Sequence, residues 1–329
     1  MHRRVIFDCF PFFQEVDMIA LRIATLENAG IFAFVGVESS RTHAGHDNPT
    51  IIPSIVNVLD PDLRNWFITH PASPVLMGKG ISAFDIESVY WHPNRNICLC
   101  RITEHDQSMT IASTRRREMR QRNAIINAIG MYYTPMSHDL IMISDVDEIP
   151  HPAIISRLHD AEIPEGTIFV LEQRLCYYNV NTTPSQNDGY IWMGTRIAQM
   201  ADVLALSPHI VRYGIGMPDS EYPKHYLAPR SGWHLSYFGG ARAVKRKMMH
   251  FLHQELNPEE HTKHVEDRIE KGEDPWGRND FVIAPTEDVP PPMIVDHARW
   301  QHFWYAGRES VRVAASADVA ASADENSSS

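Results

Sequence analysis

Three carboxylates with the spacing of a cation site, Asp145, Asp147 and Glu148, follow an apolar run at residues 140–144. The run predicts a buried strand of a parallel sheet, and open α/β sheets bind ligands outside the carboxyl ends of their strands. Carboxylates this close together repel one another, which a divalent cation relieves. Oxygen ligands favour Mg²⁺ or Mn²⁺, either of which can neutralise a departing diphosphate. The alternative is a solvated acidic turn; the buried strand before it favours the metal.

Several other polar side chains are candidates for binding a nucleotide-sugar. Arg122 and Asn123 belong to a predicted helix before this strand, where Asn123 interrupts an apolar stripe. Asn123 is either a buried, hydrogen-bonded side chain or a group near the sugar-nucleotide. Glu38 follows the second predicted strand and either accepts a bond from a ribose or caps a surface loop. Lys247 lies in a basic helix segment that either meets a diphosphate or forms a solvated face.

The elements that would position these residues alternate along the first half of the chain. Residues 4–10, 31–37, 96–102 and 140–144 predict strands, and 15–28 and 115–129 predict helices. This rhythm indicates an α/β fold with a doubly wound, mostly parallel sheet and a less regular C-terminal half.

We expect one domain over residues 1–312, with a nucleotide-sugar-binding half at 1–160 and an acceptor-side half at 161–312. Residues 313–329 contain almost only small and polar side chains and predict a disordered tail.

Composition narrows the function classes. The chain has 329 residues, and 43% of them are hydrophobic, enough for a large core. A formal net charge of −11 argues against a broad nucleic-acid surface. No apolar run approaches the roughly 20 residues of a membrane span, and no signal peptide is recognisable, so we expect a soluble, cytoplasmic protein. The four cysteines form no C-x-x-C pair and predict reduced, buried thiols.

Five segments together resemble a known enzyme family. The order Arg-Asn, helix, apolar strand and Asp-x-Asp resembles glycosyltransferases of the GT-A fold. More closely, the chain resembles glycosyltransferase family 17, the family of β-1,4-mannosyl-glycoprotein β-1,4-N-acetylglucosaminyltransferase. The segments are FDCFPFFQE (7–15), VESSRTHAG (37–45), ISDVDEIP (143–150), SGWHLS (231–236) and KMMHFLHQE (247–255). Animal members carry an N-terminal membrane anchor that this sequence lacks, which leaves an N-glycan or a microbial surface glycan as acceptor.

The resemblance implies an inverting GT-A enzyme that uses Mn²⁺ and a UDP-sugar such as UDP-N-acetylglucosamine. Asp147 would be the first metal ligand, and Asp145 a second ligand or a contact to the ribose and to metal-bound water. A histidine late in the chain often supplies the third ligand in GT-A enzymes. His234 is the first choice and His253 the second, and either is otherwise a hydrogen-bonded structural ring.

An inverting transfer also needs a base for the acceptor hydroxyl. Glu255 shares a helix face with Lys247 and is the first candidate; Asp188 and Glu172 compete with it. Glu148 is a further candidate catalytic carboxylate, which would orient the metal site or is a charge at a helix terminus.

Three other functions stay open. The first is a same-fold transferase with a galactose or glucose donor. The second is a metal-dependent phosphohydrolase, suggested by Asp8 after a strand, and the third is a carbohydrate-binding protein without turnover, suggested by the aromatic cluster at residues 300–305.

Overall fold

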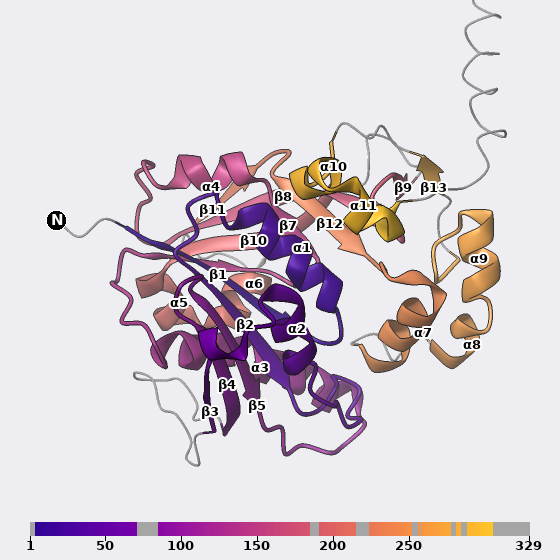
Figure 1. Cartoon of the computed structure of the whole chain (residues 1–329), viewed down its shortest axis with the longest axis horizontal. Helices are drawn as coiled ribbons and strands as arrows, with labels where there is room; N and C mark the ends of the chain where they lie inside the picture. The colour runs from indigo at the N-terminus through magenta and orange to yellow at the C-terminus, as the bar shows by residue number, and fades with distance from the viewer. Residues whose placement is uncertain are drawn as a thin grey trace, which may run out of the picture.

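A mixed β-sheet with a parallel centre forms the core of the fold (Figure 1). The computed structural model describes residues 4–70, 85–184, 191–214, 224–251, 256, 258–277, 281–283 and 288–304. The four central strands run parallel in the order β5-β2-β1-β6. They are β1 (Ile6–Phe12), β2 (Ala33–Ser39), β5 (Ile97–Ile102) and β6 (Leu140–Ile143). Strands β5-β2-β1 have the order of one half of a Rossmann sheet and β6 lies where the fourth strand would be, so the α/β fold is compatible with a Rossmann-like one.

Further strands extend this centre on both sides. The full order is β3-β4-β5-β2-β1-β6-β10-β8-β12-β7, with β11 beside β8. Strand β10 is antiparallel to β6 and β8 on either side of it. The added strands are β3 (Phe67–Thr69), β4 (Ile86–His92), β7 (Glu148–Pro150), β8 (Thr167–Tyr177), β10 (Ile191–Gln199), β11 (Lys224–Ala228) and β12 (Gly232–Ser236). A separate pair consists of β9 (Thr182–Pro184) and β13 (Phe281–Ile283).

Helices cover both faces of the sheet, as a doubly wound fold requires (Figure 1). One face packs against α1 (Val16–Leu26), α2 (Ile52–Leu59), α4 (Pro152–Leu158), α10 (Pro291–Val295) and α11 (His297–Trp300). The other packs against α3 (Ile111–Gly130), α5 (Met200–Leu206) and α6 (Pro208–Tyr213). A smaller cluster lies under α7 (Gly240–His250) and α9 (Val265–Lys271), with α8 (Pro258–Thr262) alongside. Two 3₁₀ turns are η1 (Leu63–Asn65) and η3 (Gln301–Phe303).

The predicted central strands are confirmed to within two residues, but helix α3 begins four residues earlier than the apolar periodicity indicates. The cause is a capping box. The backbone N–H of Ser113 donates to the Thr110 hydroxyl at 3.2 Å, and the Thr110 N–H donates to the Ser113 hydroxyl at 3.0 Å. These two bonds pair N–H groups that the helix leaves free, and so extend it towards Ile111.

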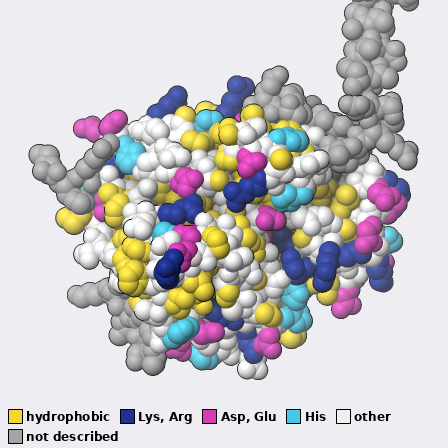
Figure 2. Space-filling model, viewed as in Figure 1, with side chains coloured by type: hydrophobic (Ala, Val, Ile, Leu, Met, Phe, Trp, Pro, Cys, Tyr) yellow, Lys and Arg dark blue, Asp and Glu magenta, His cyan; other side chains and the backbone are white. Residues whose placement is uncertain are grey.

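The predicted tail at residues 313–329 lies outside the described residues. Within the described residues, no helix is both long and apolar enough to cross a membrane. Acidic and basic side chains are interspersed over the face shown in Figure 2, with no broad area of one sign.

The four cysteines are free and buried, as predicted. Burial raises the pKa of the Cys98 and Cys176 thiols to about 12 and that of Cys9 and Cys100 well above the ordinary value. The reactive thiolate is therefore scarce and shielded at neutral pH.

We expect a thiol-reactive disulfide such as DTNB to modify none of the four cysteines in the native protein at pH 8. All four should react within minutes in guanidinium chloride, because unfolding restores both exposure and an ordinary thiol pKa. Release of the coloured thiolate gives the count. Rapid native-state labelling of even one cysteine would contradict the buried assignment.

Candidate functional site

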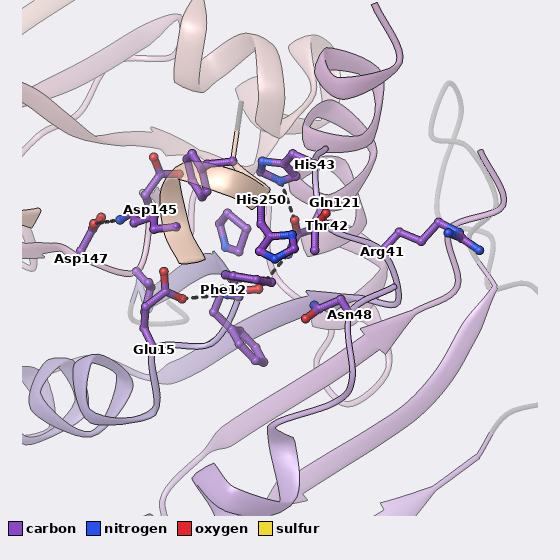
Figure 3. Close-up of a pocket in the computed structure, with 15 residues that line it drawn as sticks. Phe12, Glu15, Arg41, Thr42, His43, Asn48, Gln121, Asp145, Asp147 and His250 are labelled. Carbon is purple, nitrogen blue, oxygen red and sulfur yellow. Dashed lines mark hydrogen bonds and ion pairs between the residues drawn. The ribbon is translucent and has the colours of Figure 1, made fainter. Parts of the chain in front are cut away.

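A cavity opens outside the carboxyl ends of β1 and β6, where the chain changes from one side of β1 to the other. Open α/β sheets bind their ligands at such a point. Asp145, Asp147 and Glu15 lie on one side of the cavity, and His43 and Gln121 lie on the opposite side (Figure 3). The cavity is therefore built from loops that follow three parallel strands and from helix α3.

The C-terminal end of α7 fills much of this cavity. Lys247, His250 and Phe251 line it, and His250 lies between its two sides (Figure 3). The backbone of α7 is attached to the loop after β2, because the Ala44 N–H donates to the His250 carbonyl at 3.2 Å. Water-sized spheres fit into only about 30 Å³ of the cavity. Small-molecule sites usually offer about 300–1,000 Å³, so the cavity is much smaller than such a site.

Arg22 of α1 holds the backbone of the acidic loop. Its guanidinium donates to the carbonyls of Asp145 and Val146 at 3.2 Å and to that of Glu148 at 2.8 Å. The same group binds both oxygens of Asp8 at 2.5 and 2.7 Å. Arg22 and Asp8 are completely buried. The loop therefore has a fixed backbone, while its carboxylates remain available to other partners.

The side chain of Asp145 is held by arginines. Its Oδ1 lies 2.8 Å from Nη2 of Arg122, and its Oδ2 lies 3.8 Å from Nη2 of Arg212. Burial alone would raise the pKa of Asp145, but the two guanidinium groups outweigh it and hold the pKa below the ordinary value. Arg122, which the sequence predicts to bind the nucleotide-sugar, thus forms a direct ion pair with the acidic motif.

Asp147 has two different neighbours on its two oxygens. Nζ of Lys247 lies 2.6 Å from Oδ2, and Nε2 of His234 lies 3.6 Å from Oδ1. Burial would raise the pKa of Asp147, but Lys247 and then His234 outweigh it and hold the pKa well below its usual range. In return the carboxylate raises the pKa of Lys247, which stays charged. Of the predicted residues, Asp147, His234 and Lys247 meet at one point.

Glu148 faces into the protein, not into the cavity. It is completely buried. Its Oε1 accepts bonds from Trp192 at 2.6 Å and Arg212 at 2.5 Å, and its Oε2 accepts the Asp145 N–H at 3.0 Å. With both oxygens occupied, Glu148 fits the role of orienting the acidic loop, and we do not assign it as a catalytic base.

The gap between Asp147 and His234 is where a divalent cation would fit. A carboxylate oxygen and an imidazole nitrogen 3.6 Å apart can both bind one ion at about 2.1 Å each. No three His, Cys, Asp or Glu side chains converge as a metal site within the described part of the chain. A cation here would have few protein ligands and would take the rest from phosphate and water, as Mg²⁺ commonly does.

Two predicted binding residues have other partners. Glu38 is completely buried; its Oε2 accepts a bond from Arg101 at 2.7 Å, and its Oε1 accepts the Ile51 N–H at 2.9 Å. It holds the residue before α2, but from inside strand β2, so the predicted surface loop with a capping carboxylate is wrong. Asn123 is half-buried; it accepts the His209 N–H at 2.9 Å and holds the start of α6, which agrees with the hydrogen-bonded alternative but not with full burial.

Of the remaining predicted residues, only Glu172 belongs to the described part of the chain. Asp188, His253 and Glu255 lie outside the described residues. Glu172 lies on β8 opposite Met193 of β10.

His43 and Gln121 form a part of the site that sequence reasoning missed. The Gln121 amide donates to the carbonyls of Phe12 at 3.1 Å and Val37 at 2.8 Å, so its oxygen faces His43 and accepts from Nε2 at 2.9 Å. Nδ1 of His43 is then an acceptor, buried and without a partner among the described residues. Burial lowers the pKa of His43, which keeps the ring neutral. A hydrogen-bond acceptor thus lies in a side chain that lines the cavity.

Glu15 is a second residue that sequence reasoning missed. It precedes α1, and its Oε2 accepts the Phe13 N–H at 2.9 Å. Burial is the main cause that raises the pKa of Glu15, the Asp147 charge adds to it, and Lys247 opposes it. Glu15 stands in the FDCFPFFQE segment, so its place in a family motif was the available signal.

No protein-family model matches the sequence, and no curated protein matches it either. The resemblance to glycosyltransferase family 17 therefore stays a prediction.

We expect Arg22→Met to destabilise the fold by about 3–5 kcal/mol, because it leaves the Asp8 carboxylate buried without a counter-charge. Asp8→Leu in the same chain should recover much of that loss, since both charges are then gone. Urea unfolding measures the change, and Arg64→Met is the control, because the exposed Arg64–Asp62 pair should shift stability by less than about 0.5 kcal/mol. Equal effects of Arg22→Met and Arg64→Met would refute the role of Arg22.

Proposed function

We propose that this protein is an inverting glycosyltransferase that moves a sugar, N-acetylglucosamine in the first instance, from a UDP-sugar to a carbohydrate acceptor. One observation carries the proposal. Five segments, separated by up to about a hundred residues and each resembling family 17, all contribute side chains to the same site. Their contributions include Glu15, His43, Asp147, His234 and Lys247.

The position of the cavity supports a nucleotide-linked donor. It lies at the switch point of a Rossmann-like sheet, where such folds bind nucleotides. We also propose that the fold is of the GT-A type, with a nucleotide-sugar-binding half at residues 1–160 and an acceptor-side half at residues 161–312. We infer that the diphosphate binds beside Asp147 and the nucleoside extends towards His43, after the end of α7 moves aside.

The site is rich in fixed positive charge for a leaving diphosphate. Lys247, Arg122 and Arg212 all lie within 4 Å of an acidic-loop carboxylate. In an inverting transfer the acceptor oxygen bonds to the anomeric carbon while the diphosphate leaves with the electron pair of the broken bond. Lys247 is the cation nearest the cavity, and it can exchange its contact with Asp147 for a phosphate oxygen. Its raised pKa keeps it protonated throughout.

A divalent cation fits the same proposal. Asp147 and His234 would hold it, with Asp145 kept in place by its arginines. When bound, the metal supplies further charge neutralisation to the leaving diphosphate. The electrostatic reason for a metal is weaker than the sequence suggests, because Arg122, Arg212 and Lys247 already relieve the repulsion between the carboxylates.

Two alternative classes are disfavoured by specific contacts. The Asp8 carboxylate, which a phosphohydrolase would use, is completely buried on Arg22. Of the aromatic cluster at residues 300–305, Trp300 and Phe303 are each only 2% exposed and belong to the core. They form no open platform for a carbohydrate. A galactose or glucose donor remains the alternative within the same fold.

We expect Asp147→Asn to lower UDP release from UDP-N-acetylglucosamine by about a hundredfold or more, because it removes the anionic partner of Lys247 and of the proposed cation. The measurement is UDP production with a panel of glycoside acceptors and Mn²⁺. The matched control is Asp267→Asn, in an exposed pair with Lys271, which should leave the rate unchanged. A rate in Asp147→Asn within threefold of the wild type would overturn the mechanism.

Chelation distinguishes the contribution of a bound metal to activity from that of the fixed positive side chains. We expect EDTA to abolish UDP release and added Mn²⁺ or Mg²⁺ to restore it. In parallel, calorimetric titration of Mn²⁺ should show heat with the wild-type protein and none with His234→Ala. Full activity in EDTA would remove the metal from the proposal and leave Lys247 as the cation that meets the diphosphate.

A further inference from the structure

A second, roomier cavity lies beside the first. It is bounded by the start of α1, the β12–α7 loop, α7 and η3. Water-sized spheres fit into about 220 Å³ of it, against about 30 Å³ in the first cavity. It therefore has room for many water molecules, or for a sugar ring in their place.

The two cavities share one wall. Phe13, Glu15, Asp147 and Lys247 line both of them. The shared residues include the carboxylate and the ammonium group that the proposed function assigns to the diphosphate. A molecule in the second cavity would thus lie next to the donor's reactive end while remaining outside the donor's own site.

The lining of the second cavity has the chemistry of a carbohydrate site. Phe13 and Phe238 supply aromatic rings, and the nearly buried Phe303 packs edge to face against Phe238 with centroids 5.2 Å apart. Glu15 and Arg246 add charged groups at its border. A pyranose presents C–H faces that suit aromatic rings and hydroxyls that suit carboxylates and guanidinium groups.

Glu15 lines this cavity and has one oxygen that can accept a hydrogen bond from a hydroxyl. Its Oε2 is held by the Phe13 N–H at 2.9 Å, while no bond to Oε1 is found among the described residues. The charge of Lys247 lies close enough to act on it. One oxygen therefore fixes the side chain and the other can accept a hydrogen bond.

We propose that the second cavity is the acceptor subsite, and that it binds a pyranose ring whose attacking hydroxyl donates to Glu15. This rests on the proposed function. In the step, the hydroxyl oxygen forms a bond to the donor's anomeric carbon and its proton passes to the Glu15 carboxylate. The bond from that carbon to the diphosphate breaks, and the diphosphate leaves with the electron pair. Glu15 thus takes the role of general base.

Two variants test the two parts of this inference. Glu15→Gln keeps the size of the side chain and should lower kcat for transfer about a hundredfold or more, with a donor KM within about threefold of wild type. Phe238→Ala removes a partly exposed ring and should raise the acceptor KM about five- to tenfold without changing the donor KM. The control is Phe67→Ala on β3, an exposed ring at the far edge of the sheet, which should change neither constant. Circular dichroism and thermal melts establish that each variant is folded.

A direct binding measurement keeps the inference testable without turnover. Saturation-transfer NMR with methyl glycosides of glucose, galactose, mannose and N-acetylglucosamine should show contact with the wild-type protein and a clear loss in Phe238→Ala. If the wild type binds a glycoside through Phe238 but never releases UDP, the proposed function fails and the reaction assigned to Glu15 fails with it. If UDP is released but both variants behave as Phe67→Ala does, the acceptor subsite is wrong. Absence of glycoside binding together with unchanged kinetics overturns the inference outright.

Discussion

The buried guanidinium of Arg22 is the interaction on which the site depends. It joins three parts of the chain, because its nitrogens reach Asp8 in β1, Ser144 at the end of β6, and the carbonyls of the acidic loop. A loop that follows the carboxyl end of a strand would ordinarily expose its unpaired carbonyls to water. Here one side chain from α1 satisfies several of them inside the core. Because the backbone of the loop is already ordered in the folded protein, its acidic side chains can bind other partners without a further loss of backbone entropy.

A second layer of charge pairing balances the acidic loop. Arg122 and Arg212 hold Asp145, Arg212 also holds Glu148, and Lys247 holds Asp147. Each carboxylate therefore has its own cation within the protein. Such buried pairs add little net stability, but they fix geometry, because losing either partner leaves an uncompensated charge. The acidic motif is thus an ordered charge network, and its anionic groups are not free to take up several metal ions.

Helix α7 connects the acidic loop with the loop after β2. Its Lys247 reaches the acidic loop, and its last residues lie against the loop after β2. The same helix borders both cavities. Its apolar side packs, together with α9, on a small cluster that includes Leu175 and Tyr177 of β8. Helix α7 therefore joins the acidic loop, the loop after β2 and the main sheet.

Local pattern determined the central strands, both covering helix layers and the position of the Asp-x-Asp motif, because periodicity depends on residues only a few positions apart. Resemblance to a family added His234, and the basic helix segment singled out Lys247. Tertiary structure alone decided the partners. Arg22 meets a loop more than 120 residues away, and Glu38, predicted either at a ribose or as a cap in a surface loop, is buried on Arg101. Nothing local in the sequence distinguishes Glu15 or His43 from capping or core residues. Their place in the site follows from the strand order, which brings segments that are distant in the sequence together at the carboxyl ends of the parallel strands.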